Sequence, residues 1–205
     1  MRFAAVLLLG FLFLPNAAFS ADTTSEPLKI EILKAAAEMG NVDAQLLLGE
    51  RYSVVSIGWA PGVKRDAVKQ DYVEAMKWYR MAADQGNSEA QSTLGVFYKN
   101  GLGTKQDNAE AFKWYRKAAD QGDALAQWSI GQMFKNGEGV KQDSEQAYFW
   151  ELVAEKSQPD DPYSPHHEYY AKQLTPESIA AIKKRAQEWK PIPAPAEATG
   201  KPETK

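Results

Sequence analysis

The chain has 205 residues, a formal net charge of −3 at pH 7 and no cysteine. The missing cysteines exclude disulfide frameworks and thiolate metal sites. A weakly acidic chain also lacks the basic balance that binding to nucleic acid or to anionic lipid headgroups requires. Its 6 tryptophans, 9 tyrosines and 8 phenylalanines are sufficient to build an apolar core.

The first 20 residues have the pattern of a secretory signal peptide. Arg2 is followed by the apolar stretch Phe3–Leu14 and by the small-residue site Ala18-Phe19-Ser20. This stretch is shorter than the roughly 20 apolar residues that a membrane-spanning helix needs. We therefore expect cleavage after Ser20 and a mature protein in the periplasm, without stable membrane insertion.

An internal repeat occupies most of the remaining chain. The stretches WYRMAADQG (78–86) and WYRKAADQG (114–122) differ at one residue and begin 36 positions apart. The wider match defines units at 41–86, 87–122 and 123–158, preceded by a half unit at 30–40. Self-similarity at a fixed period of this length indicates stacked repeats. We therefore predict one repeat region over 27–158.

The first unit differs from the others by ten additional residues in its central loop, over 53–70. Four apolar residues stand in this insertion, and they are Val54, Val55, Ile57 and Trp59. They either fold onto the end of the repeat region or form a contact patch.

Each unit is predicted to form two helices. Asn41, Asn87 or Asp123 begins the first helix, and glycines such as Gly101 and Gly137 end it. The second helix begins with the capping-box patterns Asp71-x-x-Glu74, Asp107-x-x-Glu110 and Asp143-x-x-Gln146. At helical spacing we expect a repeated core of small and aromatic residues, with the glycines allowing close helix approach. It comprises Gly49, Tyr52, Trp78, Gly95, Tyr98, Trp114, Gly131, Phe134 and Trp150.

The combined pattern has a known parallel. A-Q-x-x-L-G-x-x-Y, then N-G-x-G-x-x-x-D, then A-x-x-W-Y-x-x-A-A-x-Q-G, closely resembles the Sel1-like repeat, a relative of the tetratricopeptide repeat. The resemblance extends from Ile30 to about Gln158. It implies an all-α fold, a right-handed α-solenoid of stacked helix-turn-helix repeats, and a role as an adaptor in protein complexes.

The last unit departs from this pattern. Glu151 replaces the tyrosine of positions 79 and 115, and such a charge suits a terminal face that no further repeat covers. Residues 159–190 are predicted to form a connecting loop and a C-terminal capping helix, which begins with Thr175 and Pro176. Residues 191–205 are rich in Pro, Ala, Glu and Lys, and we expect them to be disordered.

Few residues suggest chemistry. His166 and His167 stand near acidic residues, but adjacent histidines do not easily face one metal ion, so a polar connecting loop is the favoured interpretation. Ser-x-x-Lys, Gly-x-Ser-x-Gly and phosphate-loop motifs are absent. The basic and aromatic KWYR stretches at 77–80 and 113–116 are typical of nucleic-acid surfaces, but their tryptophans fall on the predicted packing stripe. We expect no catalysis, no metal and no cofactor.

Protein binding is better supported. If the tetratricopeptide geometry applies, the first helices line a concave face whose residues vary from unit to unit. The predicted lining residues are Leu46, Glu50, Ser53, Ser92, Val96, Lys99, Trp128, Gln132 and Lys135. Trp128 is the leading contact, because large aromatic residues dominate interface energies. Its alternative role is packing under the C-terminal segment.

The resemblance therefore implies a periplasmic adaptor or scaffold that binds another protein and has no catalytic activity. An alternative of the same class is an immunity protein that neutralises a lipase-type effector acting in the periplasm. A neighbouring effector gene would favour that role. A third interpretation, a cell-wall-acting hydrolase, requires turnover that is lost in His166→Ala or His167→Ala and retained in Trp128→Ala.

Overall fold

The computed structural model describes residues 26–54, 71–158 and 166–193, and within these ranges all regular structure is helical. The helices are α2 (Glu26–Glu38), α3 (Val42–Val54), α4 (Tyr72–Asp84), α5 (Ser88–Asn100), α6 (Asn108–Asp120), α7 (Ala124–Asn136), α8 (Ser144–Ser157), α9 (His167–Ala171) and α10 (Pro176–Glu188). The predicted signal peptide and most of the insertion in the first unit lie outside the described residues. No helix within the described ranges is long and apolar enough to cross a membrane.

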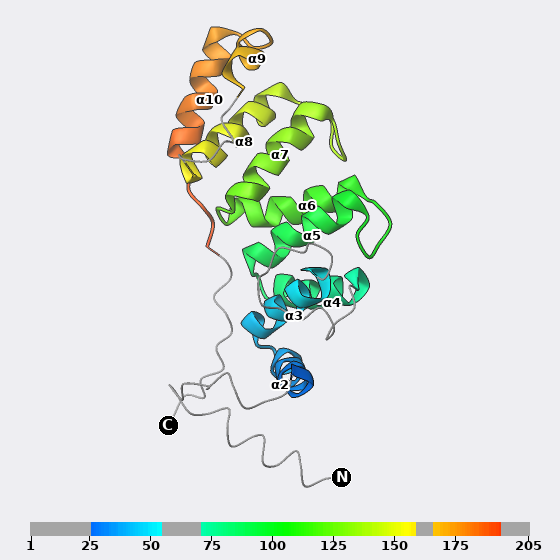
Figure 1. The fold of residues 1–205 in the computed structure, drawn as a ribbon. Coiled ribbons are helices and arrows are strands. Elements are labelled where there is room, and N and C mark those ends of the chain that lie inside the picture. The colour runs from blue at the N-terminus through cyan, green and yellow to red at the C-terminus, as the bar shows by residue number, and fades with distance from the viewer. Residues whose placement is uncertain (1–25, 55–70, 159–165, 194–205) are drawn as a thin grey trace, which may run out of the picture.

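The helices stack in chain order. The pairs α3–α4, α5–α6 and α7–α8 each pack on the next, and α2 covers the first of them (Figure 1). This arrangement confirms the predicted all-α solenoid.

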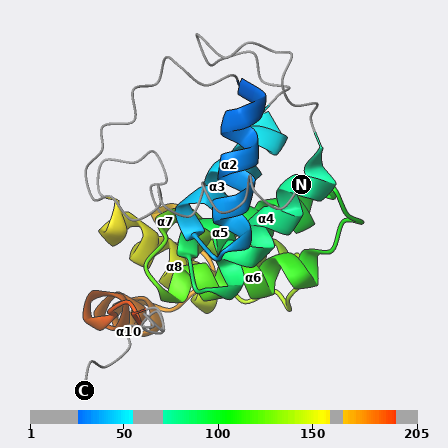
Figure 2. The same ribbon diagram turned by 90° about the horizontal axis from the view of Figure 1, so that it is seen from below.

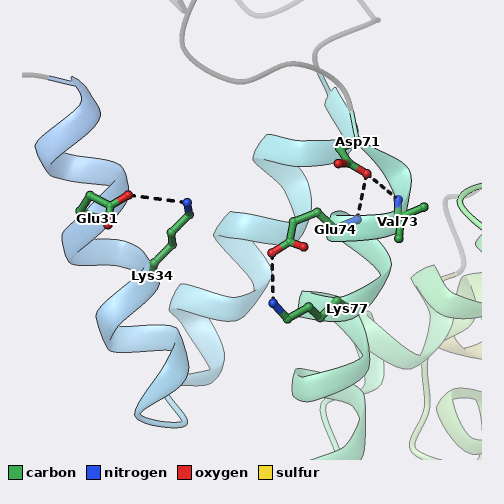
Figure 3. A network of polar contacts seen from close by, with 6 residues as sticks. All are labelled: Glu31, Lys34, Asp71, Val73, Glu74 and Lys77. Carbon is green, nitrogen blue, oxygen red and sulfur yellow. Dashed lines mark hydrogen bonds and ion pairs between the residues drawn. The ribbon is translucent and has the colours of Figure 1, made fainter.

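Aspartate side chains begin the second helices, as predicted. The Asp71 carboxylate accepts hydrogen bonds from the amides of Val73 (3.0 Å) and Glu74 (3.1 Å), which satisfies two free donors of the first turn of α4 (Figure 3). Asp143 likewise accepts from two amides at the start of α8, and Asp107 accepts from one, that of Glu110, at the start of α6.

A capping box also predicts that the glutamate or glutamine three residues later accepts a hydrogen bond from the backbone N–H of the aspartate. This part of the prediction is wrong. The backbone N–H groups of Asp71, Asp107 and Asp143 donate instead to carbonyls near the end of the preceding helix, and the acceptors are Tyr52, Tyr98 and Phe134. Because these donors are already satisfied, the glutamates are left for other partners. Glu74 pairs with Lys77 at 3.2 Å (Figure 3), and Glu110 accepts a hydrogen bond from the Trp114 indole.

The predicted core positions are buried or half-buried. The three repeat tryptophans are 2–3% exposed, and the three first-helix glycines are buried. A Cβ atom at Gly95 would lie 2.5 Å from the ring of Tyr115, so glycine is what lets α5 approach α6 so closely. The aromatic residues Tyr52, Tyr98 and Phe134 are half-buried and pack at the edges of the core clusters.

A buried glutamine ladder joins successive units. The side-chain amides of Gln45, Gln91 and Gln127 donate to carbonyls eight residues earlier, at Ala37, Ala83 and Ala119. Their side-chain oxygens accept hydrogen bonds from Gln85, Gln121 and Ser157. The Ala-Gln motif is therefore fixed by polar satisfaction in the interior as well as by packing.

The C-terminal region confirms the predicted capping helix. The Thr175 hydroxyl caps α10, and Ile182 and Ala186 are each 4% exposed where α10 packs on α8. Two details differ from the prediction. Part of the predicted connecting loop is the short helix α9. The predicted disordered tail is specifically placed as far as Pro193, since the Ile192 amide donates to the Asp120 carbonyl at 2.7 Å.

Candidate protein-binding surface

The first helices α3, α5 and α7 lie on one side of the stack, and α4, α6 and α8 lie on the other (Figure 2). The first helices α5 and α7 are also in direct contact. We call the surface of α3, α5 and α7 the first-helix face.

The first unit contributes an exposed acidic residue to this face. Glu50 is exposed, and its carbonyl accepts a hydrogen bond from the Ser53 hydroxyl at 3.0 Å. Leu46 is half-buried against a core cluster. Leu47, which the sequence prediction omitted, is 49% exposed.

The middle unit corrects one predicted residue. Ser92 is 3% exposed, because the close packing of α5 encloses its small side chain, so it does not line the surface. Val96 is half-buried against the core. Lys99 Nζ lies 3.2 Å from a carboxylate oxygen of Glu138, in the loop of the next unit, and both side chains are about one-third exposed. The ion pair of Lys99 and Glu138 therefore connects the second unit to the third.

In the third unit, Gln132 contacts the second helix α8, and Lys135 contacts the C-terminal segment. The Gln132 side chain donates to Glu151 Oε1 at 2.9 Å, and Lys135 Nζ lies 4.6 Å from the centroid of the Tyr169 ring in α9. Trp128 is half-buried and has an interaction of its own. The C-terminal segment thus occupies one end of the first-helix face.

Glu151 is the centre of a buried polar network. Its side chain is 1% exposed, although the sequence indicated an uncovered terminal charge. Oε1 accepts hydrogen bonds from Gln132 and from the Tyr170 hydroxyl at 2.9 Å, and Oε2 accepts one from the His166 amide at 3.0 Å. Because α9 covers this carboxylate and supplies donors, the charge is accommodated inside the protein.

Tyr170 is the main residue that sequence reasoning missed. It is fully buried, and its ring stacks on Tyr148 with centroids 4.8 Å apart. Burial, followed by the Glu151 carboxylate, raises the pKa of Tyr170 above its usual value, so the hydroxyl stays a donor. The available signal was the pair Tyr169-Tyr170, but α9 is too short for a helical period to show it.

The structure describes one side chain of the predicted histidine pair, that of His166. His166 Nδ1 lies 3.4 Å from Glu151 Oε2, and its side chain is half exposed. The His167 side chain lies outside the described residues. Within the described part of the chain, no three His, Cys, Asp or Glu residues are grouped as a metal ion would need.

The KWYR stretches function in packing between units. The Arg80 guanidinium lies 4.7 Å from the ring centroid of Trp114 in the next unit, and Arg116 lies 5.0 Å from that of Trp150. Both indoles are nearly fully buried. Each arginine therefore covers the tryptophan of its neighbour through a cation–π contact, and these ring faces are not open to stacking bases.

The chain matches the family model of the Sel1 repeat over residues 42–87, 88–123 and 124–150. It is similar to the crystal structure of a Sel1 repeat protein from Oxalobacter formigenes, with 32% identity and a TM-score of 0.50, over 78% of this chain and 98% of that chain. It is also similar to a protective antigen with an SLR fold from uropathogenic Escherichia coli strains, with 27% identity and a TM-score of 0.55, over 80% of this chain and 41% of that chain. No curated protein sequence matches it significantly.

Proposed function

This chain belongs to the Sel1 repeat family, and we propose that it is a periplasmic scaffold that binds another protein through its first-helix face. Proteins of this family generally act as scaffolds for protein–protein interactions. The periplasmic location rests on the signal-peptide pattern of residues 1–20.

One observation carries the proposed surface. A single structural position of the first helices holds Glu50, Val96 and Gln132 in successive units, whereas the buried glycine and tryptophan positions keep the same residue. Variation is expected where a surface serves recognition and the fold does not dictate the side chain. The exposed or half-exposed set available to a partner is Glu50, Lys99 and Trp128, with Leu47 added from the structure.

The proposed function includes no catalytic step. The titratable groups that the described residues bring together at Glu151 hold α9 against the solenoid end. Their hydrogen bonds connect them to one another and leave the Glu151 carboxylate buried. This arrangement favours a structural role for the network.

Cross-linking in cells, followed by mass spectrometry of a periplasmic extract, tests the proposal. We compare the wild type with the double variant Trp128→Ala, Lys99→Glu. The matched control is Lys113→Glu, which makes the same charge change on the opposite side, in α6, where the Lys113 side chain is 68% exposed. We expect the double variant to lose a partner that the wild type and the control both retain.

Equal recovery of the same partners by all three proteins would contradict the proposed surface. Recovery of the chain only in the cytoplasm, with residues 1–20 uncleaved, would contradict the periplasmic location. A cross-linked partner with lipase activity would favour the immunity role over the general scaffold.

A further inference from the structure

The segment that follows α10 crosses the turn between α6 and α7. We call residues Trp189–Pro193 the strap. The Ile192 amide donates to the carbonyl of Asp120, the last residue of α6, at 2.7 Å, and Pro191 lies beside Gly122 in the turn. Figure 1 shows this segment leaving α10 and running along the stack toward the earlier units.

A second set of contacts holds the beginning of the strap. The Lys156 ammonium donates to the carbonyls of Gln187 (2.7 Å) and Trp189 (3.1 Å). The Trp189 ring packs edge-on against Trp150, with centroids 6.1 Å apart. The strap is therefore fixed at both ends of its path from α8 to the α6–α7 turn.

Recognition of the strap at the turn depends on its backbone. The Ile192 side chain is 63% exposed, so the turn does not select it by burial. The Asp120 carbonyl is among the last four of α6, which have no donor within the helix. Pro191 and Pro193 flank the donating amide and hold it in an extended conformation, which lowers the entropy lost on docking.

The same turn occurs one unit earlier. Asp84-Gln85-Gly86 repeats the sequence Asp120-Gln121-Gly122, with glycine φ angles of 94° and 101°. The amide that follows each glycine donates to the equivalent helix carbonyl at 3.2 Å and 3.1 Å. In each turn the glutamine side chain also donates to a buried glutamine of a first helix. Gln85 donates to Gln45 of α3 at 2.8 Å, and Gln121 donates to Gln91 of α5 at 2.7 Å.

The Asp84 carbonyl is thus the counterpart of the Asp120 carbonyl that the strap uses. Among the described residues, no backbone amide donates to it. We propose that the α4–α5 turn is a docking site for an extended, proline-flanked segment of a partner polypeptide, held as Pro191 and Ile192 are held on the α6–α7 turn. This surface is separate from the first-helix face and does not rest on the function proposed above.

The charge around the α4–α5 turn specifies the segment further. The position equivalent to Lys156 in the preceding unit is Asp120, a carboxylate that is paired with Arg116 at 2.9 Å, so no ammonium stands there. Asp84 is exposed beside the same turn. A partner segment with a basic residue before its first proline fits this environment, as Lys190 precedes Pro191 in the strap.

A peptide of known sequence tests the proposal on the full chain. The probe is the acetylated, amidated pentapeptide Lys-Pro-Ile-Pro-Ala, which copies residues 190–194. Titrated into 15N-labelled wild-type protein, it should cause saturable shifts of the Gln85, Gly86 and Asn87 amides. The control peptide Lys-Pro-Pro-Pro-Ala lacks the central N–H and should bind about tenfold more weakly, as the loss of one hydrogen bond predicts.

A matched pair of variants tests the α6–α7 turn, which the strap occupies in the wild type. Ile192→Pro removes the amide that donates to Asp120, while Ile192→Ala keeps it and shortens only an exposed side chain. In Ile192→Pro the peptide should also shift Gln121, Gly122 and Asp123, and in Ile192→Ala it should behave as in the wild type. Shifts confined to 121–123, no saturable shift at 85–87, or equal binding of the two peptides would each overturn the proposal.

Discussion

The middle and the C-terminal end of the solenoid solve the same packing problem with different residues. In the middle unit, Gly95 of α5 faces the ring of Tyr115 on α6. In the last unit, Gly131 of α7 faces Glu151 on α8, where a Cβ atom would lie 3.0 Å from Glu151 Cγ. The backbone pairing is the same, but the facing group changes from an aromatic ring to a carboxylate.

This difference shows how a repeat can be ended. In the middle, the next unit covers Tyr115 with apolar atoms and with the Ser129 hydroxyl. At the end no further unit follows, and α9 covers Glu151 with the Tyr170 hydroxyl and the His166 amide. A buried carboxylate requires such donors, so it makes the docking of α9 specific, whereas a tyrosine there would leave those donors unpaired.

The largest effect is expected from removing the terminal carboxylate. Glu151→Ala leaves the Tyr170 hydroxyl, the His166 amide and the Gln132 amide without their common acceptor. The free energy of unfolding should fall by about 2–4 kcal/mol, because each unpaired buried donor is costly. Chemical denaturation measures this loss, and hydrogen exchange should show it concentrated in α9.

Glu151→Gln is the matched control for this change, since it keeps the shape and one acceptor oxygen. It should lose about half as much stability as Glu151→Ala. An Ala variant as stable as the wild type, with α9 equally protected from exchange, would show that the network does not anchor the end.

The corresponding residue in the middle unit should show its burial at high pH. Burial raises the pKa of Tyr115 from 10.0 to about 12. Below pH 10 the phenol is neutral in both the folded and the unfolded chain, so it adds no pH dependence. Between pH 10 and about 12 only the unfolded chain loses this proton, and stability should fall by about 3 kcal/mol.

Denaturation of the wild type and of Tyr115→Phe across pH 8–12 isolates this contribution. The difference between the two proteins should be constant up to pH 10 and then change by about 3 kcal/mol in favour of the variant. Parallel curves over the whole range would show that the Tyr115 phenol is accessible to solvent.

These two sites also mark what the sequence could and could not predict. The period of 36, the repeated glycines and the aspartate caps are local or repeated features, so one unit confirms another and the fold follows from them. The Glu151 network occurs once and joins residues 15 and 19 positions apart through a five-residue helix. Without a repeat to compare, its charge indicated exposure.

The candidate surface was less predictable for a related reason. Its residues were transferred from tetratricopeptide geometry as a set, but exposure depends on the neighbours of each side chain. Ser92 is enclosed by its neighbours, and the Gln132 side chain donates a hydrogen bond to Glu151. Only the tertiary structure shows these two environments.

Adding a methyl group to each glycine compares the two regions directly. In Gly95→Ala the new Cβ would meet the Tyr115 ring at 2.5 Å, and we expect a loss of about 1–3 kcal/mol from overpacking. In Gly131→Ala the nearest atoms are Glu151 Cγ at 3.0 Å and the Ala147 carbonyl oxygen at 3.2 Å, so the strain is smaller than at Gly95. The gain in helix propensity of about 1 kcal/mol offsets part of it. Thermal denaturation should therefore rank Gly95→Ala well below Gly131→Ala, and equal melting temperatures would contradict the difference in packing.

The smallest effect is expected where the middle unit meets the last one on the first-helix face. Lys99 and Glu138 are about one-third exposed and 3.2 Å apart, so water and salt screen their attraction. A double-mutant cycle with Lys99→Met and Glu138→Gln should therefore give a coupling free energy below about 1 kcal/mol. This coupling should decrease in 0.5 M salt. A weak pair can be exchanged at little cost. Lys99 can then leave Glu138 for a carboxylate of a partner, and Glu138→Gln should leave partner recovery unchanged while Lys99→Glu reduces it. A coupling above 2 kcal/mol that is insensitive to salt would instead make Lys99 a structural residue and remove it from the binding surface.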